Sequence, residues 1–417
     1  MTRTPPPDPT GTGSASVGPV SVGPASTGPA STGPGGDVGA AWRAARGVMP
    51  PGLLDAAGCN VPSDRTLDAV IAHLHRERRH GGYPAEPALT DARAALAALA
   101  GAAPGDVAFT ESGTSAMAAL LGGWRLPPGS RVGHTRTEYG STLMLLRRLA
   151  ADRDWTLVEL PTDPDGRLDL AGLHDHLSAG LHLVTLAHLA SHRGVVQPAA
   201  GIGALCRAAG VPLVLDACQS FGHVDVTGVG ATAYVGTSRK WLAGPRGTGF
   251  LIVPGPTPTM DAPAPTLRGH TWPGATPLPG AVRYEGAEGA IAARAGLGAA
   301  VLEHLALGPA AVHAHLAALG RAAREILDGA GGWRVIEPLD EPSALVTLRP
   351  PPADSAEDAG ARAARAGLLV GVVPPARAPL DLSAPVLRVS PPPGTPPATL
   401  RALAGVLAVN ARPAAHR

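Results

Sequence analysis

The chain has 417 residues, 45% of them hydrophobic, and a formal net charge of +1, so it is long enough for two or more folded parts around a large core. This balance gives no electrostatic basis for binding nucleic acid or an anionic membrane, and no apolar run reaches the ~20 residues of a membrane span. Three irregularly spaced cysteines predict neither a disulfide framework nor a metal site, and with no apolar leader they favour a cytoplasmic protein.

The N-terminal two-thirds of the chain predicts an α/β domain. Residues 1–37 are rich in Gly, Pro, Ser and Thr and predict a disordered tail. Alternating apolar strands and helices then favour a large domain over 38–294, with a mostly parallel seven-stranded sheet between helices. The expected strands are 106–110, 131–134, 155–160, 181–187, 212–216, 231–235 and 249–253, and the expected helices include 63–80 (with Ser63 as N-cap), 90–100, 114–124, 170–177 and 199–209.

The pattern changes after residue 294. Two long helical stretches are followed by short strands, a further helix and a last helix at the end of the chain. We therefore expect a smaller α+β domain over 295–417. Its predicted helices are 295–305, 309–327 and 357–366, and its predicted strands are 333–337, 344–348, 368–373 and 386–390.

The composition itself points to one residue. Lys and Arg together number 34, yet Lys240 is the only lysine. Arginine can replace lysine wherever a positive charge is enough, but a guanidinium stays protonated and cannot attack a carbonyl. Lys240 is therefore a candidate nucleophile, although composition alone leaves chance survival open.

Several polar residues follow predicted strands, at the sheet edge where ligands of α/β proteins bind. Asp216 ends a strand, Gln219 follows it, and Lys240 comes after the next strand. An amine, a carboxylate for a pyridine nitrogen and a donor for a ring oxygen are what pyridoxal phosphate (PLP) requires. Taken singly, each has an ordinary structural role as well. Two further features complete the hypothesis. Tyr139 can cover the face of the ring, and Thr114 and Ser115 lie at a predicted helix start that can bind the phosphate.

The pattern Asp216-x-x-Gln219 … Ser238-x-Lys240-x-x-x-Gly244-Pro245 resembles the class-V aminotransferase family of fold-type-I PLP enzymes, which includes cysteine desulfurases. The resemblance implies that Lys240 forms the Schiff base, that Asp216 pairs with the pyridine nitrogen and that Gln219 reaches the ring oxygen. It also implies a phosphate site and a substrate-carboxylate site. Their residues are Thr114, Ser115 and Ser238 for the phosphate, Ser191 and Tyr139 as further cofactor contacts, and Arg388 with Asn60 for the carboxylate.

A narrower resemblance covers residues 81–83, 190–194, 238–247 and 332–344, which are similar to the PLP-dependent hercynylcysteine sulfoxide lyases of ergothioneine biosynthesis. It implies a β-elimination in which Lys240 removes the Cα proton of a cysteine sulfoxide. Residues proposed to hold the imidazole-bearing group are Tyr83, His192 and Arg239.

Other readings stay open at this point. Desulfurases carry a cysteine shortly before the carboxylate-binding arginine, but residues 371–388 contain none, which disfavours persulfide transfer. Epimerisation, transamination and a non-catalytic scaffold are the alternatives. Cys59, Cys206 and Cys218 are interpreted as structural, with Cys218 the one candidate for the cofactor's surroundings. Residues 284–288 resemble the part that such enzymes lend to a neighbouring subunit's phosphate site, which predicts a homodimer.

Overall fold

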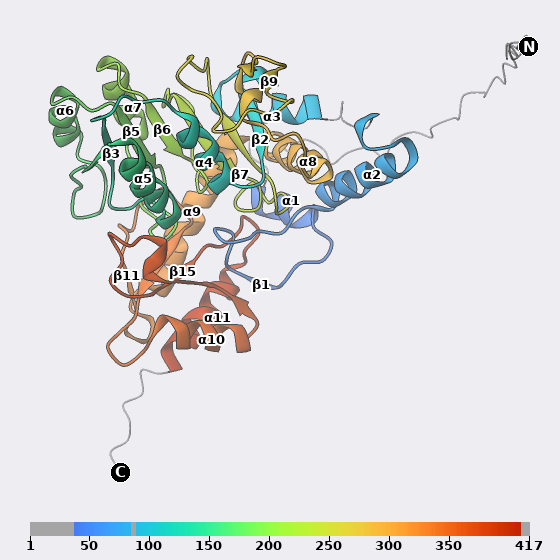
Figure 1. Ribbon diagram of the computed structural model, residues 1–417. Coiled ribbons are helices and arrows are strands. Elements are labelled where there is room, and N and C mark those ends of the chain that lie inside the picture. Colours follow the sequence, from blue (N-terminus) through green and yellow to red (C-terminus); the bar gives the residue numbers. More distant parts are fainter. Residues whose placement is uncertain (1–36, 85–88, 410–417) are drawn as a thin grey trace, which may run out of the picture. The chain divides into compact units, whose positions relative to one another are not determined.

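The computed structural model describes residues 37–84 and 89–409 (Figure 1). The predicted tail lies outside these residues except for Asp37. Within them the principal sheet has seven strands in the order β2-β8-β7-β6-β5-β3-β4, and only β8 is antiparallel to its neighbours. The predicted mostly parallel α/β sheet is therefore confirmed. The strands are β2 (Val107–Thr110), β3 (Arg131–His134), β4 (Thr156–Glu159), β5 (Leu183–Ala187), β6 (Leu213–Asp216), β7 (Ala233–Thr237) and β8 (Gly249–Ile252).

Helices cover both faces of this sheet because alternate strand residues point to opposite sides. In β6, Leu213 and Leu215 belong to one apolar cluster and Val214 belongs to another. The first cluster includes helices α3 (Leu89–Ala100), α6 (Leu170–Ser178), α7 (Ala199–Ala208) and α8 (Ile291–Leu307), and the second includes α4 (Gly113–Gly123) and α5 (Gly140–Arg153).

The N-terminal segment contributes α1 (Val38–Ala44), β1 (Gly52–Leu53) and α2 (Asp64–His80). Ser63 caps α2 as predicted, since its side chain accepts a hydrogen bond from the Thr66 amide. Asp64 in the first turn and a basic last turn complement the helix dipole, and Gly81 ends the helix at a φ of 85°. Helix α2 then packs along α8.

A second, antiparallel sheet follows in the C-terminal part, in the order β11-β12-β15-β14. Its core contains apolar residues of three helices, among them Leu327, Ala359 and Leu403. The strands are β11 (Arg334–Val335), β12 (Val346–Arg349), β14 (Gly371–Val373) and β15 (Val386–Val389), and the helices are α9 (Pro309–Leu327), α10 (Ala356–Arg365) and α11 (Pro397–Ala408).

Two C-terminal predictions differ from the structure in detail. The strand expected over 368–373 is two strands, because β13 (Leu368–Leu369) pairs with β1 and the chain changes partner before β14 pairs with β15. Helix α8 begins at Ile291, so the predicted division after residue 294 falls inside it; that division stays a prediction. The structure also contains the short pair β9 (His270–Thr271) and β10 (Thr276–Pro277), and the 3-10 turns Pro104–Asp106, Ala281–Tyr284, Ala330–Gly332 and Pro375–Arg377.

Among the described residues, no single helix meets the length and hydropathy of a membrane span. Helices α8 and α9 meet them only as a pair, and they are bent by 83° at the break between them.

Candidate active site

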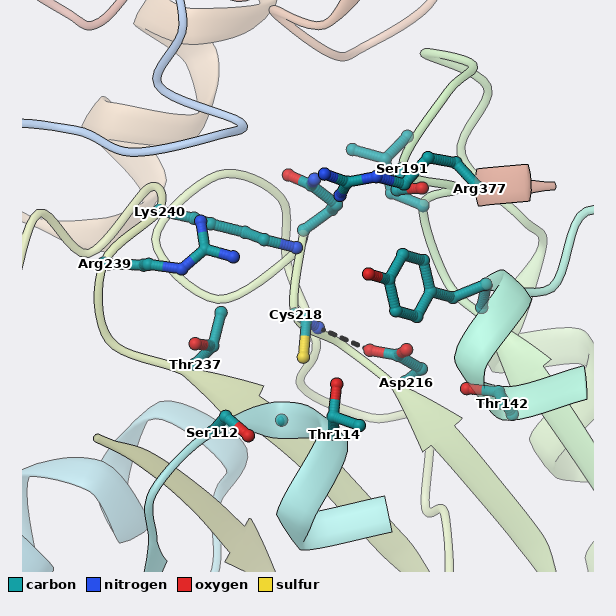
Figure 2. Close-up of a pocket in the computed structure, with 15 residues that line it drawn as sticks. Ser112, Thr114, Thr142, Ser191, Asp216, Cys218, Thr237, Arg239, Lys240 and Arg377 are labelled. Carbon is teal, nitrogen blue, oxygen red and sulfur yellow. Dashed lines mark hydrogen bonds between the residues drawn. The ribbon is translucent and has the colours of Figure 1, made fainter. Parts of the chain in front are cut away.

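A cavity lies beyond the carboxyl ends of β5, β6 and β7, against the start of α4 (Figure 2). It is where an α/β sheet is expected to bind its ligand. The structure brings seven of the predicted site residues into its wall, from segments more than 100 positions apart in the chain. The complete lining is Ser112, Gly113, Thr114, Tyr139, Thr142, Ala187, Leu189, Ser191, Asp216, Cys218, Gln219, Thr237, Arg239, Lys240 and Arg377.

Lys240 reaches into this cavity from the turn after β7 (Figure 2). Burial lowers the pKa of its amine, the charges of Cys218 and Asp216 oppose that shift, and Arg239 and Arg388 reinforce it. A larger fraction of the amine is therefore neutral than in water. This is the state that a nucleophile or a base requires.

Asp216 stands at the end of β6, and its Oδ1 accepts a hydrogen bond of 3.0 Å from the Cys218 amide. Glu138 is fully buried and electrostatically coupled to it. Burial first, and then the charge of Asp216, raise the pKa of Glu138 to about 8. Because two adjacent carboxylates disfavour double ionisation, Glu138 holds its proton at neutral pH.

The start of α4 forms a second wall. Ser112 caps the helix by accepting from the Ser115 amide at 3.1 Å, and the Ser115 hydroxyl accepts from the Ser112 amide at 2.9 Å. The Ser115 side chain is thus occupied as a cap and is not in the cavity wall. Thr114 is in the wall, and a Cβ on Gly113 would overlap the Cys218 sulfur. The helix N-terminus and these small side chains leave room for an anion.

Ser238 was predicted to bind the phosphate, but its side chain is not in the cavity wall. It is fully buried, and its Oγ has no hydrogen-bond partner among the described residues. A Cβ on Gly244 would overlap this oxygen, so the turn closes over it.

Arg388 lies on β15, buried behind the wall that Ser191 forms. Its guanidinium donates to the Ser191 carbonyl at 2.8 Å and to Asp55 at 2.7 Å. Arg388 Nε, Ser191 Oγ and Asn60 Nδ2 are three of the buried polar atoms that have no hydrogen-bond partner in the described part of the chain. All three belong to residues that the sequence assigned to cofactor or substrate binding, and unpaired buried groups of this kind are expected at ligand sites.

His192 and Tyr83 are not part of the cavity wall. His192 is fully buried, bonds to Asp381 at 2.8 Å and has a pKa lowered chiefly by burial. Tyr83 is 84% exposed and lines a different pocket with Arg268 and Glu288. Within one chain, neither side chain is placed to contact a group bound at Lys240.

Sequence reasoning missed several wall residues and one partner. From the sequence, Cys218 is interpreted mainly as a structural residue. Its side chain lies in the cavity wall, as its place between Asp216 and Gln219 in the motif could have indicated. Arg377 follows β14, and its guanidinium carbon lies 5.8 Å from the centre of the Tyr139 ring. Asp55, the partner of Arg388, lies in no motif that the sequence analysis used. The remaining unpredicted polar wall residues are Ser112, Thr142 and Thr237.

A profile of the family described as aminotransferase class-V matches residues 64–362. The chain belongs to this family, and its cofactor is PLP. It is 41% identical over 364 residues to a probable hercynylcysteine sulfoxide lyase of Mycobacterium tuberculosis, covering 84% of this chain and 88% of that protein. It is 29% identical to a probable cysteine desulfurase of Methanothermobacter thermautotrophicus over 48% of this chain and 52% of that one.

Solved structures show the same fold. A C-DES variant with glycine covalently linked to its PLP cofactor superposes with a TM-score of 0.77 at 21% identity, over 87% of this chain and 98% of that one. The cysteine desulfurase CsdA of Escherichia coli superposes with a TM-score of 0.77 at 19% identity, over 88% of this chain and 97% of that one. The fold is fold-type I.

The residues present fit PLP. The cavity combines an amine whose pKa is lowered by burial, a carboxylate at a strand end, an aromatic ring and a helix N-terminus lined by small residues. Among the described residues, no group of three or more His, Cys, Asp or Glu is arranged to hold a metal ion.

Lys240→Arg keeps the positive charge but cannot condense with an aldehyde, since the guanidinium keeps its proton. After borohydride reduction, peptide mapping of the wild-type holoenzyme should find the cofactor attached to the peptide that contains residue 240. The folded K240R variant should give no such adduct. A wild-type enzyme whose adduct lies on another peptide, or on none, contradicts the assignment.

Glu138→Gln tests the buried carboxyl group. Because the pKa of Glu138 is raised to about 8 on folding, its contribution to stability is complete below the unfolded value near 4.5 and is lost as the pH rises to about 8. The glutamine variant should escape this loss, which is on the order of a few kcal/mol. Urea unfolding between pH 5 and pH 8.5 measures how the free energy of unfolding of each variant changes with pH. The exposed Glu159→Gln variant is the control, and parallel pH curves for E138Q and wild type would refute the buried acid.

Proposed function

We propose that this enzyme is a PLP-dependent carbon–sulfur lyase that cleaves hercynylcysteine sulfoxide in ergothioneine biosynthesis. The observation that carries the proposal is 41% identity to a probable hercynylcysteine sulfoxide lyase over 84% of this chain. The cavity supports it, because it supplies a base, an anchored carboxylate and cations, and the loop before Arg388 contains no thiol.

When bound, PLP supplies an electron sink for the Cα carbon of an amino acid. Asp216 keeps the ring nitrogen protonated, and Arg388 with Ser191 and Asn60 receives the substrate α-carboxylate. The neutral Lys240 Nζ accepts the Cα proton. The Cβ–S bond then breaks and its electron pair leaves with sulfur, so the products are a sulfenate and a three-carbon fragment that water converts to pyruvate and ammonium.

The sulfoxide is the better substrate for such an elimination because its leaving group carries the new charge on oxygen. Arg239 and Arg377 face the cavity from opposite sides, and both bring positive charge to a developing anion (Figure 2). No persulfide is needed in this reaction. Cys218 is the one thiol in the wall of this cavity, and burial raises the pKa of Cys218 well above its ordinary value, which keeps it protonated and unreactive.

Incubation with hercynylcysteine sulfoxide and a thiol reductant should yield ergothioneine and pyruvate in equal amounts, and K240R should yield neither. The matched substrates are the hercynylcysteine thioether and L-cysteine, which should react at least about tenfold more slowly, a barrier difference of about 1.4 kcal/mol. Alanine with sulfide from L-cysteine would instead identify a desulfurase. A keto acid together with pyridoxamine phosphate would identify an aminotransferase. A substrate recovered with inverted configuration at Cα would identify an epimerase.

We also propose that the enzyme is a cytoplasmic homodimer. The free thiols Cys59, Cys206 and Cys218 support a reducing compartment. Exposed aromatic residues support an interface, because Tyr83 and Trp272 are each 84% exposed. Tyr83 also lines a surface pocket together with Glu288, which belongs to the segment 284–288. Glu285 does not reach outward, since it is buried and pairs with Arg93 and Arg268.

Sedimentation of the holoenzyme should give twice the chain mass of 41.8 kDa at the concentrations used for assay. Trp272→Ser should shift the equilibrium toward single chains if this surface forms the interface, whereas the exposed Met144→Ser, on α5, should not. A single chain with full activity would contradict the homodimer.

A further inference from the structure

The side-chain amide of Gln219 is held at both of its ends. Its Oε1 accepts a hydrogen bond of 2.8 Å from the Trp241 indole N–H, and its Nε2 donates to the Ala57 carbonyl at 3.1 Å. Gln219 and Trp241 are 2% and 4% exposed, so water does not replace either bond. Gln219 nevertheless lines the cavity beside Lys240.

Trp241 is held in turn by His223. The two rings stack with their centres 3.7 Å apart and their planes at 23°. His223 Nδ1 lies 3.0 Å from the Gln219 carbonyl, and its Nε2 lies 2.7 Å from the Ala344 amide. An amide N–H can only donate and a carbonyl can only accept, so His223 has one tautomer, protonated at Nδ1. Burial lowers the pKa of His223 to about 3, so the ring is neutral at working pH.

The same rule determines the orientation of the Gln219 amide. An indole N–H can only donate and a carbonyl can only accept, so a flipped amide would oppose NH₂ to N–H and oxygen to oxygen. Two unsatisfied buried pairs would each cost about 1–3 kcal/mol. The observed orientation leaves one Nε2 hydrogen unused. Gln219 can therefore donate this hydrogen toward the cavity.

We propose that Trp241 is a positioning residue that fixes Gln219 as a hydrogen-bond donor to the ring oxygen of the bound cofactor, with His223 holding the indole in place. Trp241 acts through Gln219 and contacts no substrate. These contacts concern only the bound cofactor, so the test below does not depend on which substrate the enzyme uses.

Trp241→Phe keeps a stacking ring and removes the N–H. The Gln219 amide should then be held only by its bond to the Ala57 carbonyl, and the ring oxygen should lose part of its hydrogen bond and retain more negative charge. That charge favours a proton on the nitrogen that joins the cofactor to Lys240. In the holoenzyme, the midpoint of the pH-dependent change in cofactor absorbance should move upward by about one pH unit, and the cofactor should bind about tenfold more weakly.

Two controls separate positioning from general damage. Trp333 is also buried, and its indole donates to Asp354 at 3.3 Å in the core of the other sheet, so Trp333→Phe should lower stability without moving the midpoint. In a Gln219→Leu background, which itself should raise the midpoint, Trp241→Phe should add nothing. An unchanged midpoint in W241F, or a shift that persists in the Q219L background, overturns the proposal.

Discussion

The enzyme depends on placing one amine where its charge is disfavoured. Lys240 is enclosed at the carboxyl edge of the sheet, and burial lowers its pKa while Arg239 and Arg388 add to the effect. An exposed lysine would remain protonated and unable to attack or accept a proton at neutral pH. Asp216 at the end of β6, Cys218 in the loop after it and Thr114 at the start of α4 line the same cavity as Lys240.

The proposed substrate-carboxylate site is assembled from chain segments that are remote in sequence. Arg388 on β15 donates to Asp55, 333 positions earlier, and to the carbonyl of Ser191. The same N-terminal segment is joined to the strand end by backbone bonds, with Ser390 donating to the Leu54 carbonyl at 2.7 Å and the Ala56 amide donating to Ser390 at 2.9 Å. Arg388 therefore takes this position only when both segments have docked, so the proposed carboxylate site depends on the folding of the C-terminal sheet.

The sequence predicted the local features well because they are set by neighbouring residues. Strand ends, the helix capped by Ser63 and the order Asp216, Gln219, Lys240 all follow from periodicity and short motifs. Contacts that depend on tertiary structure could not be found in this way: nothing near Asp55 indicates Arg388. The Ser115 hydroxyl illustrates the same limit, since a serine at a helix start suits either a phosphate or a cap, and only the bond to Ser112 decides. The Gln219–Trp241 bond joins two motif residues 22 positions apart, and their shared burial becomes visible only in the fold.

The loop between β14 and β15 carries Arg377, which lies in the cavity wall, and Asp381, which bonds to His192. Residues 371–388 contain no cysteine, unlike the corresponding segment of the desulfurases that the sequence resembles. Here Asp381 holds the segment in place, because its carboxylate bonds to His192 at 2.8 Å and lies 3.4 Å from Arg136 and 3.8 Å from Arg193. Burial favours a higher pKa for Asp381, but the hydrogen bond with His192 and the charges of Arg193 and Arg136 outweigh it and lower the pKa, so the carboxylate stays ionised at neutral pH. His192, which the resemblance implies as a substrate contact, is bonded to this loop within the chain. A held loop presenting a guanidinium suits an elimination, in which no protein group has to reach the departing sulfur.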